Sequence, residues 1–189
     1  MGEAFTPTRT VVTVHRFQDM VAAGVWRDDE RIELIEGDIV DMAPIGGAHA
    51  WAVTRASELL REIAADRAIL WVQLPVVLGD RSQPQPDLAL IRHRAGGYAE
   101  ALPAAGDILL VVEVSDTTID YDRGTKMRLY AGHGLPEYWI LDLPQRRVEV
   151  FRGPGPSGYA QRTQARDEEK ITVEALPGTA LTAGAFFAA

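Results

Sequence analysis

The sequence predicts an α/β (α+β) fold in which a mixed central β-sheet is flanked by helices. One observation is the order of the expected elements: a helix and a hairpin, a long helix, strands, another helix and further strands. Another is the run of residues 108–114, which is apolar except at Glu113, as in a central strand covered by helices on both faces. With 189 residues and no repeat or long linker, we expect a single domain over residues 1–189.

The N-terminal part of the chain predicts a short helix followed by a hairpin. Residues 1–10 are polar and include a proline, so we expect a loose arm. Residues 13–24 carry an apolar stripe at helical spacing, with Thr13 as a cap and Gly24 as the end. In residues 31–42 apolar positions alternate with acids around Glu36-Gly37-Asp38, which predicts a β-hairpin.

The middle of the chain predicts the longest helix and the first strands of the main sheet. Apolar residues follow the 3.6-residue period across residues 48–66. Residues 69–78 are aromatic and β-branched, and Pro75 interrupts them, which indicates an edge strand or a bulge. Pro86 then opens the strand that carries Asp87.

The C-terminal half predicts one more helix among strands. Residues 92–106 are rich in Gly and Ala and indicate a loop or weak helix. The remaining predictions are a helix at 121–132, a buried strand at 137–142, its hairpin partner at 147–151, a flexible turn at 153–158, a polar strand and loop at 159–172, and a short apolar tail after 176–178.

Composition excludes several classes of function. The chain has no cysteine, so disulfides, thiolate zinc sites and a cysteine nucleophile are absent, which fits a cytoplasmic protein. The N-terminus has no signal-peptide pattern, and no apolar run is long enough to cross a membrane. A net charge of −8 does not favour nucleic-acid binding, although it allows a divalent-cation site or a local basic groove.

Two acids in otherwise apolar strands form the main candidate site. An ionised carboxylate in a strand core costs several kcal/mol unless it is paired or bound to metal. Residues i and i+2 of a strand share a face, so Asp87 should lie with Ala89 and Ile91, and Glu113 with Val111 and Leu109. If the strands are neighbours, both carboxylates enter one cleft and suit Mg²⁺ or Mn²⁺, with the Val114 carbonyl as a further ligand.

The following helix offers a lysine to the same cleft. Asp122, Lys126, Tyr130 and His133 fall on one stripe at helical spacing. Lys126 could hold a nucleophilic water or a phosphate oxygen. From spacing alone a structural interpretation stays open, in which Asp87 caps a turn and Asp122 pairs with Lys126 on a solvated face.

These residues resemble a known family. Pro86-Asp87 followed by a strand that ends in Glu113-Val114-Ser115 is similar to the PD-(D/E)XK nuclease signature without its lysine. The segments at 113–118, 122–130 and 134–142 resemble the Uma2 family more narrowly, as do Glu33-Leu34-Ile35-Glu36-Gly37, His49 and the 176–178 turn. The resemblance covers the chain from about Thr13 to the C-terminus.

The resemblance implies a restriction-endonuclease-like fold and Mg²⁺-dependent cleavage of phosphodiester bonds, with DNA as the expected partner. It implies that Asp87 and Glu113 bind the metal, that Lys126 replaces the missing lysine and positions the water, and that Glu36 completes the acid set. Glu36 is interpreted equally well as a turn residue before Gly37.

Other residues have weaker assignments, and other functions stay open. His49 could face the site, but we expect it to cap its helix or lie on the surface, and we expect Asp122 to orient Lys126. We also expect Tyr130 to pack in the core, Asp142 to serve a turn, and His93 to be solvated between two arginines. One alternative is a catalytically inactive binding or regulatory protein, with a homodimer surface made from Trp139 and the hairpins; another is a hydrolase of small phosphates.

Overall fold

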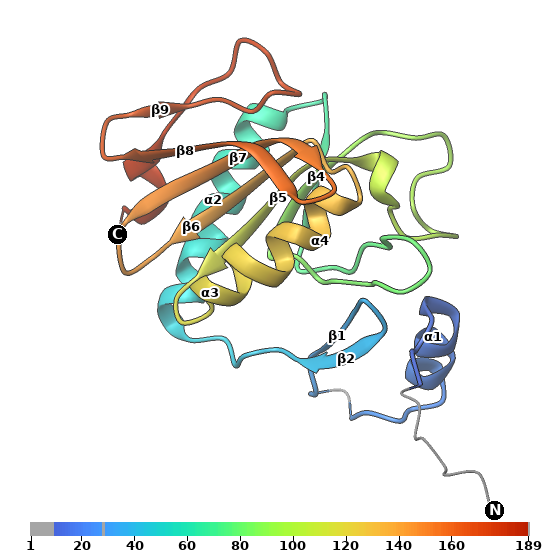
Figure 1. Cartoon of the computed structure of the whole chain (residues 1–189). Helices are drawn as coiled ribbons and strands as arrows, with labels where there is room; N and C mark the ends of the chain where they lie inside the picture. The colour runs from blue at the N-terminus through green and yellow to red at the C-terminus, as the bar shows by residue number, and fades with distance from the viewer. Residues whose placement is uncertain (1–9, 28, 189) are drawn as a thin grey trace, which may run out of the picture.

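The computed structural model describes residues 10–27 and 29–188, and Figure 1 shows its arrangement. Except for Thr10, the predicted N-terminal arm lies outside the described residues. The elements before the main sheet are α1 (Val14–Ala22), β1 (Ile32–Ile35), β2 (Asp38–Asp41) and α2 (Gly47–Ala64). The rest are β3 (Ile69–Val72), β4 (Leu88–Ile91), η1 (Ala105–Asp107), β5 (Ile108–Ser115), α3 (Ile119–Tyr121), η2 (Asp122–Lys126), α4 (Met127–Gly132), β6 (Glu137–Asp142), β7 (Arg147–Gly155), β8 (Gly158–Arg166), β9 (Lys170–Ile171), β10 (Leu181–Thr182) and η3 (Ala183–Phe187).

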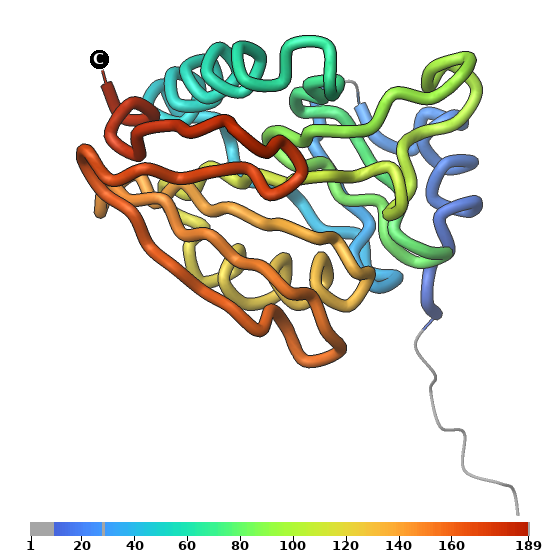
Figure 2. The backbone as a smooth tube through the Cα atoms, turned by 90° about the horizontal axis from the view of Figure 1, so that it is seen from above, coloured from blue at the N-terminus to red at the C-terminus, as the bar shows by residue number. Residues whose placement is uncertain are grey.

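The central sheet has six strands in the order β3-β4-β5-β6-β7-β8. β5 and β6 run parallel and every other neighbouring pair is antiparallel, so the sheet is mixed. Figure 2 shows α2 on one side of this sheet and the α3–η2–α4 segment on the other. The predicted fold class, a mixed sheet flanked by helices, is confirmed.

Each face of the sheet buries its own apolar layer. On the α2 face, Ala56 and Leu60 of the helix pack over alternate strand residues such as Val112 and Leu141. On the opposite face, Leu129 and Tyr130 belong to a second layer, together with the strand residues Ala89, Val111 and Ile140. Because successive residues alternate between the two faces, four acids lie on the face of the second layer, which α3–η2–α4 covers: Asp87, Glu113, Asp142 and Glu149.

A β-bulge changes one predicted face. The pairing of β4 with β5 shifts between Leu90 and Ile91, so that Ile91 faces Ile108 and Leu90 faces Leu110. Leu109 is the extra residue and packs in the α2 layer. The prediction that Leu109 shares the face of Glu113 is therefore wrong, although Val111 does lie on that face.

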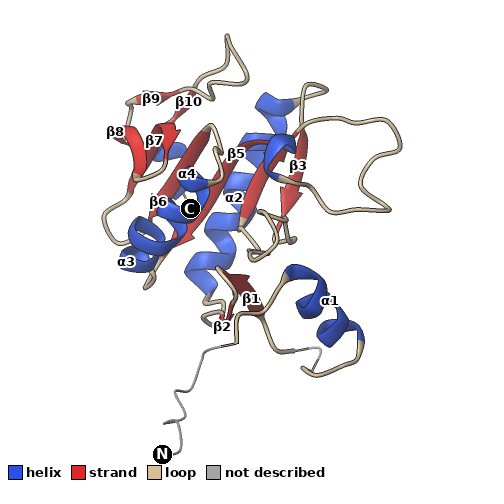
Figure 3. Ribbon diagram, turned by 45° about the vertical axis from the view of Figure 1, so that its right-hand side comes forward, coloured by secondary structure: helices blue, strands red, loops and turns tan. Residues whose placement is uncertain are grey.

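The β1–β2 hairpin forms a separate two-stranded sheet beside α1, as Figure 3 shows. Its turn uses positive φ at Glu36 and Gly37 (51° and 88°), the geometry of a tight two-residue hairpin. Leu34 is fully buried against Phe17 of α1, and its backbone pairs with Gln83. The hairpin is thereby held at the edge of the large sheet, where one of its faces can reach the β4–β5 region.

Several element boundaries differ from the predictions. β3 ends at Val72 before Pro75 and is an edge strand, as expected, but the chain does not continue as a strand to residue 78. The segment predicted as a flexible turn at 153–158 is mostly paired strand, because the ladder runs to Gly155 opposite Gly158. The predicted helix at 121–132 begins earlier, at Ile119, and contains the π-helical turn η2.

The C-terminal segment completes the core rather than forming a loose apolar tail. Phe186 in η3 is buried and meets Trp139 edge-on, with ring centroids 6.2 Å apart. Trp139 is fully buried and donates its indole N–H to Glu137. Trp139 therefore cannot line a dimer surface, and that part of the homodimer prediction is wrong.

Candidate active site

A pocket of about 470 Å³ lies between the β1–β2 hairpin, the start of α2, the end of β5 and the α3–η2 segment. Its wall holds the three residues that the sequence singled out, Asp87, Glu113 and Lys126, and all three are at least 94% buried. They come from the residue before β4, from β5 and from η2. The pocket is therefore the place where the predicted constellation is assembled.

Asp87 precedes β4 by one residue, so it sits where the chain enters the sheet rather than inside the strand. Its carboxylate accepts hydrogen bonds from His49 Nε2 (3.1 Å), the Val114 amide (2.9 Å) and Gln73 Nε2 (3.3 Å). Burial alone would raise the pKa of Asp87, but the hydrogen bond and charge of His49, with the Val114 amide, hold it below its ordinary value.

Glu113 points to the same side of the sheet as Asp87. Its Oε1 accepts from the Tyr130 hydroxyl at 2.7 Å and from Lys126 Nζ at 3.1 Å. Its Oε2 accepts from the Asp87 amide at 3.3 Å. Complete burial raises the pKa of Glu113 to about 8. The charge of Lys126 lowers this pKa, and the neighbouring acids raise it again.

Lys126 joins the hairpin to the sheet. Its Nζ lies 2.6 Å from Glu33 Oε1 as well as 3.1 Å from Glu113. Burial would lower the pKa of Lys126, but these two carboxylates outweigh burial and raise it, so the amine is protonated. The alternative in which Lys126 pairs with Asp122 on a solvated face is excluded, because Lys126 is 4% exposed.

The hairpin supplies Glu33 to the cluster, and not Glu36. Glu36 is exposed at the turn, where its backbone amide donates to Ser82. Glu33 is 2% exposed and accepts from both Lys126 and the Gln85 amide. Strand alternation alone could not have indicated this, because Ile35 on the face of Glu33 and Leu34 on the face of Glu36 are both buried.

His49 also faces the site, which corrects the expected capping or surface role. The N-cap of α2 is Gly46 and has no side-chain hydrogen bond, whereas the His49 imidazole is bonded to Asp87. That bond raises the pKa of His49, although burial opposes the shift. Gln73 is a further partner of Asp87 that sequence reasoning missed, because it reaches the site from the loop after the edge strand β3.

The helical stripe brings in Tyr130 but not His133. The Tyr130 hydroxyl bonds Glu113, so this residue is more than core packing. His133 is exposed at the end of α4. Asp122 does not bond Lys126; its Oδ2 accepts from the hydroxyls of Ser115 and of Thr118, and burial raises its pKa.

Two polar atoms in the pocket wall have no hydrogen-bond partner among the described residues. They are the Tyr121 hydroxyl and His49 Nδ1, and both atoms are buried. An unpaired buried polar group is costly and is uncommon in folded proteins. The two atoms therefore mark positions where a polar ligand would find a partner.

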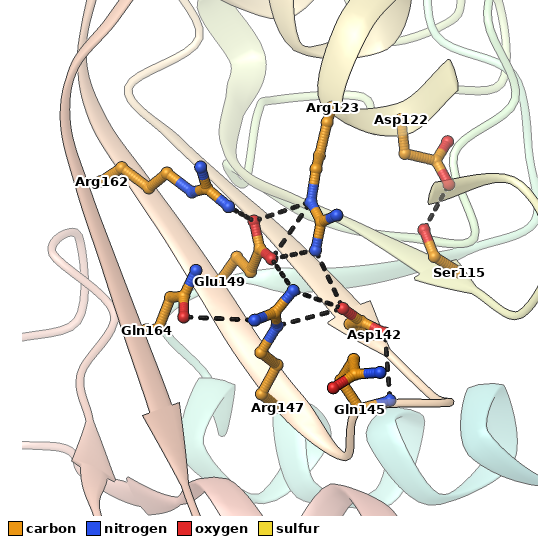
Figure 4. Close-up of polar contacts among 9 residues, drawn as sticks. All are labelled: Ser115, Asp122, Arg123, Asp142, Gln145, Arg147, Glu149, Arg162 and Gln164. Atoms are coloured by element: carbon orange, nitrogen blue, oxygen red, sulfur yellow. Dashed lines mark hydrogen bonds and ion pairs between the residues drawn. The ribbon is translucent and has the colours of Figure 1, made fainter. Parts of the chain in front are cut away.

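A second charged cluster lies on the same face of the sheet, and Figure 4 shows it together with the Asp122–Ser115 pair. Asp142 and Glu149 are buried and bind three arginines: Arg123 of η2, Arg147 of β7 and Arg162 of β8. Asp142 also accepts from the Gln145 amide, which is the predicted turn role. His93, in contrast, is exposed in its loop, as expected.

Comparison with known proteins points to one class of protein. The model of the Uma2 family, described as "Putative restriction endonuclease", matches residues 16–184. A solved structure from Anabaena variabilis, titled as a "putative nuclease belonging to DUF820", has 17% identity and a TM-score of 0.73, over 93% of this chain and 97% of that one. No curated protein matches.

No helix within residues 10–27 and 29–188 has the length and apolarity to cross a membrane.

Proposed function

The chain belongs to the Uma2 family and has a nuclease-like fold, and from this premise we propose that it is a metal-dependent endonuclease that hydrolyses phosphodiester bonds in DNA. The observation that carries the proposal is the convergence of Asp87, Glu113 and Lys126 on one pocket wall, with Lys126 Nζ 3.1 Å from Glu113. Burying these acids and the lysine together costs considerable free energy of folding, which supports a chemical role for them.

The balance of charge supports a cation in this pocket. Four buried carboxylates line the pocket: Glu33, Asp87, Glu113 and Asp122. Among the described residues, the basic groups that pair with them are Lys126 and His49. Glu113 is left without a cation of its own, since Lys126 lies closer to Glu33 and His49 is bonded to Asp87. Asp122 is bonded by the hydroxyls of Ser115 and Thr118 instead of a cation. A divalent cation would supply the missing positive charge and favour the ionised form of Glu113.

The donor set fits Mg²⁺ or Mn²⁺, which prefer carboxylate and carbonyl oxygens. We assign Asp87 and Glu113 as the carboxylate ligands and the Val114 carbonyl as a further ligand. Within residues 10–27 and 29–188, no group of three or more His, Cys, Asp or Glu is arranged to hold a metal alone. Mg²⁺ sites with one or two carboxylates are ordinarily completed by waters and substrate phosphates, which is the kind of site proposed. When bound, the ion would favour ionisation of a coordinated water.

The remaining side chains orient these groups. Glu33 holds the Lys126 amine from the hairpin side, so that Nζ is fixed between two carboxylates and its third proton can hold a water or a phosphate oxygen. Tyr130 fixes Glu113, and His49 with the Val114 amide fixes Asp87. Such support keeps reacting groups in position without reorganisation during the reaction.

A second candidate is an inactive binding or regulatory protein with the same fold. It is favoured by the charge of the pocket wall, where six acidic side chains face only Arg31, Lys126 and His49. Such a wall repels phosphate unless cations are bound. The two candidates therefore differ in whether added metal produces cleavage.

The test is cleavage of single- and double-stranded DNA by the purified protein with Mg²⁺, Mn²⁺ or a chelator. We expect cleavage only with metal, and loss of about 10²–10⁴-fold in rate in Lys126→Met. Lys170→Met is the matched control, because Lys170 is exposed on β9 and is the only other lysine in the chain. Absence of cleavage by the wild type under all conditions would favour the inactive protein, and equal cleavage by Lys126→Met would reject this site.

A further inference from the structure

Tyr121 lines the pocket and has no role in the proposed mechanism. Its hydroxyl is buried in the pocket wall and has no hydrogen-bond partner among the described residues. Other buried or half-buried tyrosine hydroxyls nearby are paired: Tyr130 with Glu113, Tyr138 with the Asp122 carbonyl and Tyr159 with the Leu135 carbonyl. The Tyr121 hydroxyl is therefore the exception on this face of the sheet.

The π-helical turn explains how Tyr121 reaches the pocket. In η2 the Met127 amide bonds the Asp122 carbonyl, five residues back, instead of four. Residues five apart in an α-helix point about 140° away from each other, given 3.6 residues per turn. The wider turn reduces this separation, so Tyr121 and Lys126 both line the pocket, together with Asp122.

The electrostatic surroundings define what Tyr121 can bind. Lys126 is the cation that acts on its hydroxyl, and Glu33, Glu113 and Asp122 are the acids that act on it. Burial, with these acids, raises the pKa of Tyr121 to about 12, so the hydroxyl keeps its proton and can donate it in a hydrogen bond. A donor next to a protonated amine suits an anionic oxygen.

We propose that Tyr121 is a substrate-binding residue whose hydroxyl donates a hydrogen bond to an anionic phosphate oxygen held beside Lys126. The inference rests on the proposed function for the identity of the substrate, a phosphodiester. It adds a hydrogen-bond donor to the site formed by Asp87, Glu113 and Lys126. It also gives the π-helical turn a role, because the turn brings Tyr121 and Lys126 to the same phosphate.

The test is Tyr121→Phe, which removes only the hydroxyl oxygen. We expect the free energy of unfolding without ligand to stay the same or rise, because an unpaired buried group is removed. We expect kcat/KM for DNA cleavage to fall about 10- to 100-fold, the factor for one hydrogen bond to a charged group. Tyr159→Phe is the matched control: it removes a hydroxyl that is paired outside the pocket, so it should lower stability and leave kcat/KM unchanged.

A second readout separates this inference from the proposed function. Inorganic phosphate is titrated in the presence of Mg²⁺, and its effect on thermal unfolding is measured for wild type, Tyr121→Phe and Tyr159→Phe. If the wild type does not cleave DNA, the proposed function fails, but phosphate that stabilises wild type more than Tyr121→Phe still supports the donor role. Unchanged cleavage in Tyr121→Phe, or equal phosphate stabilisation of both proteins, would overturn the inference.

Discussion

Two charged clusters lie on the same face of the sheet, below α3–η2–α4, and they differ in their balance of charge. In the cluster of Figure 4, two buried carboxylates, Asp142 and Glu149, are matched by three guanidinium groups. In the pocket, four buried carboxylates, Glu33, Asp87, Glu113 and Asp122, are matched by one amine and one imidazole. Both clusters bury acidic groups, but only the first compensates them fully within the protein.

This difference indicates different uses of buried charge. Arg123 lies in η2 between Asp122 and Lys126 and bonds both acids of the arginine cluster. The fully matched cluster therefore anchors the turn from which Lys126 reaches the pocket. The pocket cluster, which is short of positive charge, is the part of the face that a cation or another ligand would complete.

The largest expected effect comes from neutralising one acid in each cluster. Glu149→Gln leaves Arg123 and Arg147 beside a neutral amide in a buried position, and breaking such a network costs about 3 kcal/mol or more of stability. Glu113→Gln removes an acid that has no cation of its own, so we expect a change of less than about 1 kcal/mol, or stabilisation. Urea unfolding of the metal-free proteins at neutral pH measures both.

Glu168→Gln is the control for this comparison, because Glu168 is exposed and belongs to neither cluster. Equal destabilisation by Glu113→Gln and Glu149→Gln would show that both acids are equally compensated. The distinction between an anchoring cluster and a ligand site would then be wrong.

A smaller effect is expected from pH. The folded protein holds the pKa of Glu113 at about 8, above the ordinary 4.5, so the folded state binds more protons between these values. Stability of the metal-free protein should therefore fall as pH rises across this range, by at most ~1.4 kcal/mol per pH unit from this group. His49 contributes with the same sign, since its pKa is also raised.

The measurement is urea unfolding at several pH values for wild type and Glu113→Gln. We expect the difference between them to diminish at low pH, where Glu113 is protonated in both the folded and the unfolded state. Saturating Mg²⁺ should flatten the wild-type slope, because a metal binds the ionised carboxylate. Parallel pH profiles for the two proteins would mean that Glu113 is compensated inside the protein.

The sequence predicted the parts of the fold that depend on local pattern. The apolar run around Val111, the period of α2 and the turn at Glu36-Gly37 each specify an element without help from distant residues. What could not be predicted are features set by tertiary contact. The bulge at Leu109 follows from how β4 pairs with β5, and Trp139 is buried because η3 returns to cover it.

The candidate site shows the same division. Asp87, Glu113 and Lys126 were found because a charged residue interrupts an apolar run or completes a known motif. Glu36 was chosen in place of Glu33, and His49 was expected to be a cap or surface residue, because only the docking of the hairpin and of α2 shows which side chains face the pocket. The π-helical turn at η2 has no periodic signal of its own, so Tyr121 was not considered.

The smallest effect is expected at the rim of the arginine cluster. Arg162 is half-exposed and donates to Glu149 Oε2 at 2.8 Å, while Arg123 and Arg147 still bind the same carboxylate if it is removed. We therefore expect Arg162→Gln to cost less than about 1 kcal/mol in urea unfolding, as for other exposed ion pairs. Arg147→Gln is the matched comparison and should cost more, since Arg147 is less exposed and bonds Asp142 as well. A loss in Arg162→Gln as large as that in Glu149→Gln would mean that the third guanidinium is required. The cluster would then have no surplus of positive charge, and its contrast with the pocket would have to rest on geometry alone.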